Sequence, residues 1–265
     1  MNDAITELVR RHDPDRFLTA LFAPPDRRGA LLTLYAFNHE LARAREVASE
    51  PALALIRLQW WREVVEGQRK RHEVATPLSD AIAQGLLVPA DLLAVIDARE
   101  TETEDGIKTL TEWRDWLLAG PGGLSVAAAR LLGAPDPESF RAAGAAYGAA
   151  GVLRGIAGLA AQGRCLLPFD VLAEQGLSSE EAIADPTAPS MRTATAQLAR
   201  EGLRLLRQTP HTRIGIAAAL PAVLARRDLM RWPRIDHPRR FGDRFAVTFS
   251  GLTRRIPISP SRGED

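Results

Sequence analysis

The chain has 265 residues, 46% of them hydrophobic and 25% charged, and these proportions are ordinary for a globular protein. Its net charge of +1 gives no overall field that favours nucleic acid or a strongly acidic partner. Cys165 is the only cysteine, so an intramolecular disulfide and a cysteine-based zinc site are excluded, and a reducing compartment fits best.

Helical periodicity dominates the N-terminal half, and strand patterns are scarce. Helices are expected to begin near Pro24–Pro25, Pro51 and Pro89, because proline is favoured in the first turn of a helix. The segment LTEWRDWLLAG is expected to end its helix at Gly120, because the Pro-Gly-Gly sequence of 121–123 is a stop signal.

The C-terminal half continues this pattern. Residues 136–164 form a long helical stretch rich in alanine and glycine. Its small residues over 142–163 either widen a pocket or let helices pack closely, and the sequence leaves both readings open. Further helices are expected over 190–209 and over 215–232, the second interrupted at Pro221.

Together these elements predict one all-α domain over residues 1–265, with roughly ten helices and a frayed tail over about 254–265. The N-terminal stretch MNDAITELVRRHDPDRF has no apolar core of signal-peptide length, and no apolar run approaches the roughly 20 residues needed to cross a bilayer. We therefore expect a cytoplasmic protein, and contact with the inner face of the cytoplasmic membrane stays open.

Three segments carry a resemblance to a known family. In chain order they read FLTALFAPPDRRGALLTLYAFNHELARARE, RLQWWREVVEG and GVLRGIAGLAAQGRCLLPFDVLAEQGL. They resemble the first helix pair, the following helix and the second Asp-rich region of squalene and phytoene synthases, over most of residues 15–180. The resemblance implies an isoprenoid (terpenoid) synthase-like helical bundle with a central cavity.

The acids that such enzymes use are missing here. The family's enzymes ionise an allylic diphosphate with Mg²⁺, which requires carboxylates on two facing helices. The positions that resemble the first pair of aspartates hold Ala42 and Arg43, and those that resemble the second pair hold Gly155 and Leu159. Gly158 stands where another acid is common. The resemblance therefore implies no metal site, no cofactor and no catalytic residue.

Two shorter segments resemble one branch of the superfamily more closely. AFNHELA (36–42) and LQWW (58–61) are similar to the complex I assembly factor branch and its alphaproteobacterial relatives. That resemblance implies a non-catalytic role in assembling respiratory NADH:quinone oxidoreductase, with its subunits or assembly intermediates as partners and a lipid or isoprenoid ligand as a further option. The alternatives are an active Mg²⁺-dependent prenyltransferase acting on farnesyl or geranylgeranyl diphosphate, and a plain lipid-binding protein.

The resemblance also marks residues expected to line the cavity. They are Tyr35, Asn38, Ala42, Glu46, Arg154, Gly155, Gly158, Leu159 and Arg164. The two arginines suit phosphate, because a guanidinium can bind it in a bidentate manner; alternatively they cap helices or form salt bridges.

Several other residues invite a functional interpretation that we weigh against a structural one. His39 is expected on the surface or on a cavity wall. Of Trp60 and Trp61, one is expected in the core and the other partly exposed. The two tryptophans of TEWRDWLLAG are expected to pack in the core. The acidic stretch 99–106 is expected to be a solvated helix end.

Overall fold

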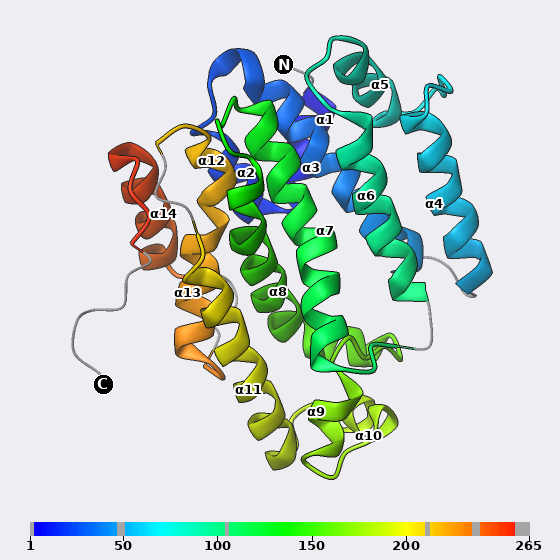
Figure 1. Cartoon of the computed structure of the whole chain (residues 1–265), viewed down its shortest axis with the longest axis vertical. Coiled ribbons are helices and arrows are strands. Elements are labelled where there is room, and N and C mark those ends of the chain that lie inside the picture. The colour runs from blue at the N-terminus through cyan, green and yellow to red at the C-terminus, as the bar shows by residue number, and fades with distance from the viewer. Residues whose placement is uncertain (1–2, 47–50, 104–105, 210–212, 235–238, 258–265) are drawn as a thin grey trace.

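The computed structural model describes residues 3–46, 51–103, 106–209, 213–234 and 239–257 (Figure 1). Within these ranges the chain forms helices and loops and no strand, which confirms the all-α prediction. The elements are α1 (Asp3–His12), α2 (Pro14–Ala20), α3 (Pro25–Glu46), α4 (Pro51–Val65), α5 (Ala75–Ala83), α6 (Pro89–Glu100), η1 (Thr101–Thr103), α7 (Leu110–Leu131), η2 (Glu138–Phe140), α8 (Arg141–Ala161), α9 (Phe169–Ala173), α10 (Ser179–Ala184), α11 (Pro189–Leu206), α12 (Ile216–Ala219), α13 (Pro221–Arg231) and α14 (Phe241–Thr253). The number of helices in the described ranges exceeds the roughly ten expected from average helix length, because short helices such as α9, α10 and α12 connect the long ones.

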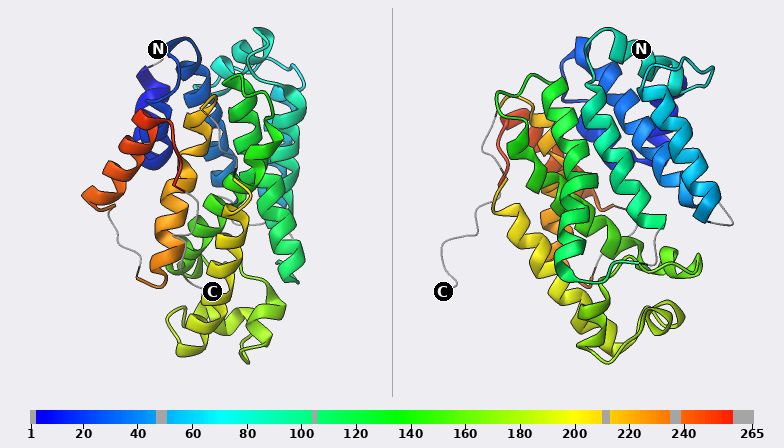
Figure 2. Two further views of the ribbon diagram at one scale, coloured as in Figure 1. Left: turned by 60° about the vertical axis from the view of Figure 1, so that its left-hand side comes forward. Right: turned by 45° about the vertical axis from the view of Figure 1, so that its right-hand side comes forward.

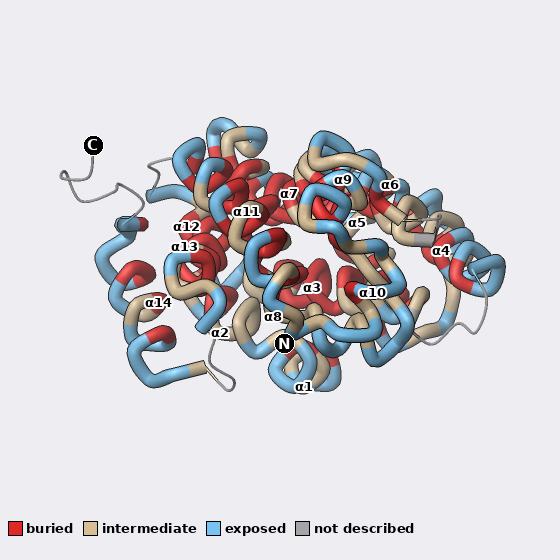
Figure 3. Tube along the Cα trace, turned by 90° about the horizontal axis from the view of Figure 1, so that it is seen from below, coloured by how far each residue is buried: buried red, intermediate tan, exposed pale blue. Residues whose placement is uncertain are grey.

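Helices α7 and α8 pack side by side at the centre of the bundle (Figures 1 and 2). Helix α6 packs on α7, and α11 and α13 pack on α8, so the two central helices are covered from both sides. Helices α4 and α14 lie at opposite edges in Figure 1. A view along the bundle shows the buried stretches gathered inside and the exposed stretches of α14 at the rim (Figure 3).

Pro121 does not end its helix, and α7 continues through it, contrary to the prediction from sequence. A Cβ on Gly144 of α8 would lie 2.4 Å from the Pro121 carbonyl oxygen, and one on Gly148 would lie 2.5 Å from Pro121 Cγ. These glycines let α8 pack directly on the proline. Arg141 Nη1, at the start of α8, also donates to the Leu118 carbonyl at 3.0 Å and so bonds α8 to the turn of α7 that precedes Pro121.

The small residues of α8 serve both purposes that the sequence left open. Gly144 and Gly148, in its first half, permit close packing against α7. At Gly151 and Gly158, further along, a Cβ would meet nothing within 4 Å beyond the local helix backbone and chain neighbours, and a Cβ at Gly155 would meet only Leu159, at 3.9 Å. The first half of α8 is therefore a packing surface, and the second half borders open space.

Two further expectations can be compared with the structure. The predicted interruption at Pro221 is confirmed, because α12 ends at Ala219 and α13 begins at Pro221. Trp61 is buried and Trp60 is half-buried, as expected. None of the described helices is both long and apolar enough to span a bilayer.

Candidate functional site

A cavity of about 610 Å³ lies beside the second half of α8. Its walls come from the α1–α2 corner, from α3, from the end of α6 with η1, from α7, and from α8 with the loop that follows it. Half-buried His39 lies on this wall and stacks on His12, with 4.5 Å between the ring centroids. Trp116, which is only 7% exposed, belongs to both the core and the wall.

The structure brings most of the predicted cavity residues together around this space. They are Asn38, Ala42, Arg154, Gly155, Gly158, Leu159 and Arg164. Tyr35 is instead buried in the core next to the cavity, with its ring 5.6 Å from the Arg16 guanidinium carbon. Glu46 ends α3, and its side chain lies outside the described residues. That these residues bind a ligand stays a prediction.

At one end of the cavity, two arginines share one carboxylate. Glu102 Oε1 lies 2.6 Å from Arg99 Nη1, and Glu102 Oε2 lies 3.4 Å from Arg164 Nη2. Arg99 also donates to the Asn38 side-chain oxygen at 3.1 Å. The Glu102 side chain is only 5% exposed, so the interpretation of 99–106 as a solvated helix end is wrong for this residue. Two guanidinium groups compensate the Glu102 carboxylate for the hydration that it loses on burial.

At the α1–α2 corner, Asp13 performs two tasks. Its side chain accepts the Arg16 backbone N–H at 3.0 Å, which caps α2, and it pairs with Arg16 Nη1 at 2.9 Å. The Arg16 guanidinium lies over the Tyr147 ring, 4.8 Å from its centroid. Burial raises the pKa of Tyr147, so its hydroxyl keeps its proton at any physiological pH.

Arg154 is held in a buried network next to the cavity. Its Nη1 lies 3.1 Å from Asp15 Oδ2 and 3.3 Å from Asp228 Oδ2. Arg239 contacts the same two acids, at 2.7 Å and 2.5 Å. Tyr147 donates to Asp15 at 3.2 Å. Burial raises the pKa of Asp228 to about 7, although Arg154 opposes this shift. The network joins α2, α8, α13 and the segment that leads into α14.

All four arginines on the cavity wall are therefore paired with carboxylates of the chain itself. They are Arg16, Arg99, Arg154 and Arg164. An anionic ligand would have to compete with these ion pairs, each of which is at least half-buried. The arginines therefore serve as salt-bridge partners, one of the two roles that the sequence left open.

Comparison with known proteins identifies the family. A family model described as squalene/phytoene synthase matches residues 9–250, which is nearly the whole chain. The chain belongs to the squalene/phytoene synthase family. This result confirms the resemblance seen in the sequence, and the described helices agree with the isoprenoid synthase fold that it implied.

Solved structures of the squalene/phytoene synthase family share this fold. A dehydrosqualene synthase in complex with ligand superposes with a TM-score of 0.76 at 13% identity, over 94% of both chains. The squalene synthase HpnC from Alicyclobacillus acidocaldarius gives 0.67 at 19% identity, over 86% of this chain and 91% of that one. Among named relatives, the mouse protein "NADH dehydrogenase (ubiquinone) complex I, assembly factor 6" is 28% identical over 227 residues, which cover 82% of this chain and 68% of the mouse protein.

The cavity does not fit the Mg²⁺ sites expected of a squalene/phytoene synthase. Within the described ranges, no three His, Cys, Asp or Glu side chains come together in a group that could hold a metal ion. The carboxylates on the wall, Asp13 and Glu102, are both engaged by arginines. The predicted positions on α8, Gly155 and Leu159, do lie on the wall but offer no side-chain oxygen.

Asp13 and Glu102, the acids that pair with arginines of the cavity wall, are not among the site residues predicted from the sequence. Asp13 stands directly before Pro14, where an acid signals a helix start and nothing more. Glu102 lies in a stretch whose composition is typical of an exposed segment. Their arginine partners in the cavity are three to 62 residues away, so only the fold reveals the longer pairings.

Proposed function

We propose that this protein is a non-catalytic member of the squalene/phytoene synthase family that assists the assembly of respiratory NADH:quinone oxidoreductase. One observation carries the proposal: the arginines of the cavity wall are paired with acids of the chain, and the described part of the chain has no cluster of acids or histidines that could hold a metal ion. Ionising a prenyl diphosphate requires divalent ions to neutralise the leaving group, and those ions require several oxygen ligands. The names of the relatives, complex I assembly factor 6, support the same role.

The proposed partners are subunits or assembly intermediates of the respiratory complex. We place the protein in the cytoplasm, in contact with the inner face of the cytoplasmic membrane where that complex is built. The cavity volume of about 610 Å³ lies within the range of small-molecule sites, so a lipid or isoprenoid ligand belongs to the proposal. Mass spectrometry of organic extracts from the purified protein tests for such a ligand.

Deletion of the gene in its own host tests the proposed role. We expect the membrane content of intact NADH:quinone oxidoreductase, measured on native gels and as NADH:quinone activity, to fall several-fold and to recover with the wild-type gene. Succinate dehydrogenase activity of the same membranes is the control and should not change. Unaltered amounts of the assembled complex in the deletion strain would contradict the proposal.

A second function has support in the fold. Family membership and the superposition on a dehydrosqualene synthase favour an active prenyltransferase, for which Mg²⁺ would be the cofactor. Such an enzyme would release diphosphate from farnesyl or geranylgeranyl diphosphate only when Mg²⁺ is present. The misfit between the cavity wall and a metal site makes this the weaker of the two proposals.

A further inference from the structure

Helix α14 turns its apolar face away from the protein. Phe241, Phe245, Phe249 and Leu252 follow one another at i, i+4, i+8 and i+11, a spacing that usually marks the buried face of a helix. Here they are 83%, 58%, 58% and 75% exposed. The phenylalanine rings also stack along the helix, with centroids 6.5 Å and 6.2 Å apart. We call these four residues the phenylalanine face.

The orientation of α14 is fixed by its opposite side. Asp243 is buried and pairs with Arg227 at 2.5 Å and with Arg231 at 2.9 Å, both on α13. Val247 is fully buried, and a Cβ on Gly251 would lie 2.4 Å from the Phe22 ring. Because these contacts hold the small and polar side of α14 against the bundle, the phenylalanine face must point outward.

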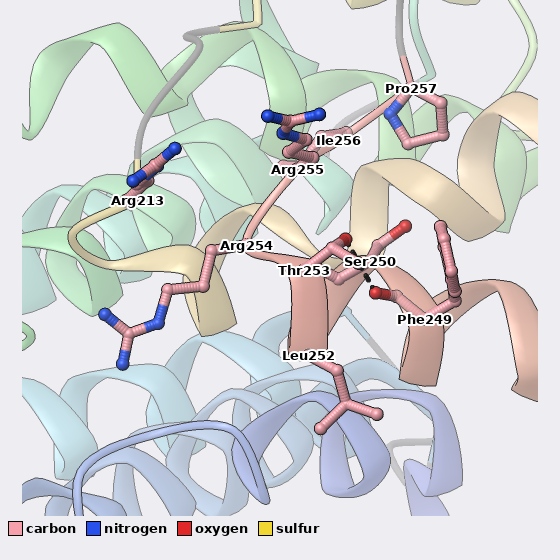
Figure 4. Close-up of a pocket in the computed structure, with 9 residues that line it drawn as sticks. All are labelled: Arg213, Phe249, Ser250, Leu252, Thr253, Arg254, Arg255, Ile256 and Pro257. Carbon is pink, nitrogen blue, oxygen red and sulfur yellow. Dashed lines mark hydrogen bonds between the residues drawn. The ribbon is translucent and has the colours of Figure 1, made fainter.

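Positive charge surrounds the phenylalanine face. From 240 to 257 the sequence contains four arginines and a single acid, the buried Asp243. Where α14 ends, a hollow of about 690 Å³ is lined by Arg213, Arg254 and Arg255 together with apolar groups of Phe249 and Leu252 (Figure 4). All three arginines are exposed, and none of the ion pairs found among the described residues includes them.

We propose that α14 docks this protein onto a membrane surface that contains anionic phospholipids. The phenylalanine face would enter the boundary between headgroups and acyl chains, and the arginines would bind lipid phosphates, for which bidentate guanidinium contacts are well suited. The helix has 13 residues, about 20 Å at 1.5 Å per residue, so it can lie in the interface but cannot span the roughly 30 Å of hydrocarbon.

The shape and charge of this surface favour a bilayer over a protein partner. Helix α14 lies at the outer edge of the bundle in Figure 1 and in the left view of Figure 2, where a flat surface can approach it. Its exposed charges all have one sign, which matches the negative potential of an anionic leaflet. This proposal deepens the membrane contact included in the proposed function, by naming the surface and the lipid class, and it is tested separately from the assembly role because it concerns lipid binding by the isolated protein.

Co-sedimentation of the full chain with vesicles tests this proposal. We expect binding to vesicles of phosphatidylcholine with about 30% phosphatidylglycerol, and much weaker binding to phosphatidylcholine alone. The double variant Phe245→Ser/Phe249→Ser should bind at least about tenfold more weakly, because apolar burial is lost. Arg254→Glu/Arg255→Glu should bind at least about 30-fold more weakly, because two favourable charges are lost and two repulsive ones are added, and added salt should also weaken binding of the wild type.

Exposed residues elsewhere supply matched controls. Ile56 on α4 is 65% exposed, and Arg200 on α11 is also exposed, so Ile56→Ser and Arg200→Glu make similar changes away from α14. Both should bind vesicles as the wild type does. Failure of the wild type to sediment with anionic vesicles, or wild-type binding by both α14 variants, would overturn the proposal. The proposal would also be overturned if the wild type self-associates on size exclusion, does not bind vesicles, and loses its self-association in the α14 variants. The phenylalanine face would then be an interface between copies of the chain. None of these measurements involves the respiratory complex, so the assembly role stands or falls separately.

Discussion

At the scale of single residues, the site is defined by how carboxylates and guanidinium groups are matched. Glu102 serves Arg99 and Arg164, and Asp15 serves Arg154 together with Arg239 outside the cavity wall. Breaking such a pair leaves a charge in a poorly hydrated place, which costs far more than losing an exposed pair. Each of these acids can therefore be tested through stability.

Replacement of Glu102 tests whether it neutralises the cavity. Glu102→Gln should lower the free energy of unfolding by about 3 kcal/mol, because two arginines lose their carboxylate. Millimolar inorganic diphosphate should then raise the melting temperature of the variant while leaving the wild type unchanged. The matched control is Glu138→Gln. The Glu138 side chain is 58% exposed and pairs with Arg141, so this substitution should lower the free energy of unfolding by less than about 1 kcal/mol. Equal, small losses in both variants would contradict this role.

Asp228 gives the protein a pH-dependent stability. Burial raises its pKa from 3.8 to about 7, so between these values the folded state holds a proton that the unfolded state releases. The contribution of Asp228 is therefore complete below the unfolded value and is lost as the pH rises through about 7. The free energy of unfolding of the wild type, minus that of Asp228→Asn, should fall by about 2 kcal/mol from about pH 5 to pH 8. A difference that stays constant would mean that Arg154 and Arg239 keep Asp228 ionised throughout.

At the scale of elements, the two halves of α8 differ in how tightly they are packed. Its first half is pressed against α7, and its second half borders the cavity. Glycine lowers helix stability where nothing requires it, and it is needed where a neighbouring backbone comes close. The glycines of α8 therefore divide into two groups that should respond to alanine in opposite directions.

Alanine substitutions along α8 measure this division. Gly158→Ala should raise the free energy of unfolding by about 0.5–1 kcal/mol, because the new methyl group meets nothing and helix propensity improves. Gly144→Ala should lower it by about 1–3 kcal/mol, because its Cβ would overlap Pro121 and Ser125. Chemical denaturation of both variants checks the signs. A loss at Gly158 as large as that at Gly144 would show that the second half of α8 is also tightly packed.

At the scale of the whole molecule, the sequence predicted the fold better than it predicted the packing at Pro121 and the long-range ion pairs. Helical periodicity and the family resemblance predicted an all-α isoprenoid synthase fold. The resemblance also predicted that Asn38, Arg154 and Arg164 line one cavity, where the structure places them. Pro121 was misread because a local stop signal is overridden by packing of α8 on α7. The pairing of Asp15 with Arg239 joins positions 224 residues apart, and no local pattern contains that information.

The chain combines the fold of a dehydrosqualene synthase with a cavity wall whose described arginines and carboxylates lie in ion pairs. Release of diphosphate from labelled farnesyl or geranylgeranyl diphosphate, with and without Mg²⁺, tests the proposed non-catalytic role most directly. We predict no release above the protein-free control in either condition, because the arginines and carboxylates of the wall lie in ion pairs and no group of acids or histidines among the described residues could hold Mg²⁺. Mg²⁺-dependent release that grows with the amount of purified protein would show that the cavity is catalytic and would contradict the proposed non-catalytic role.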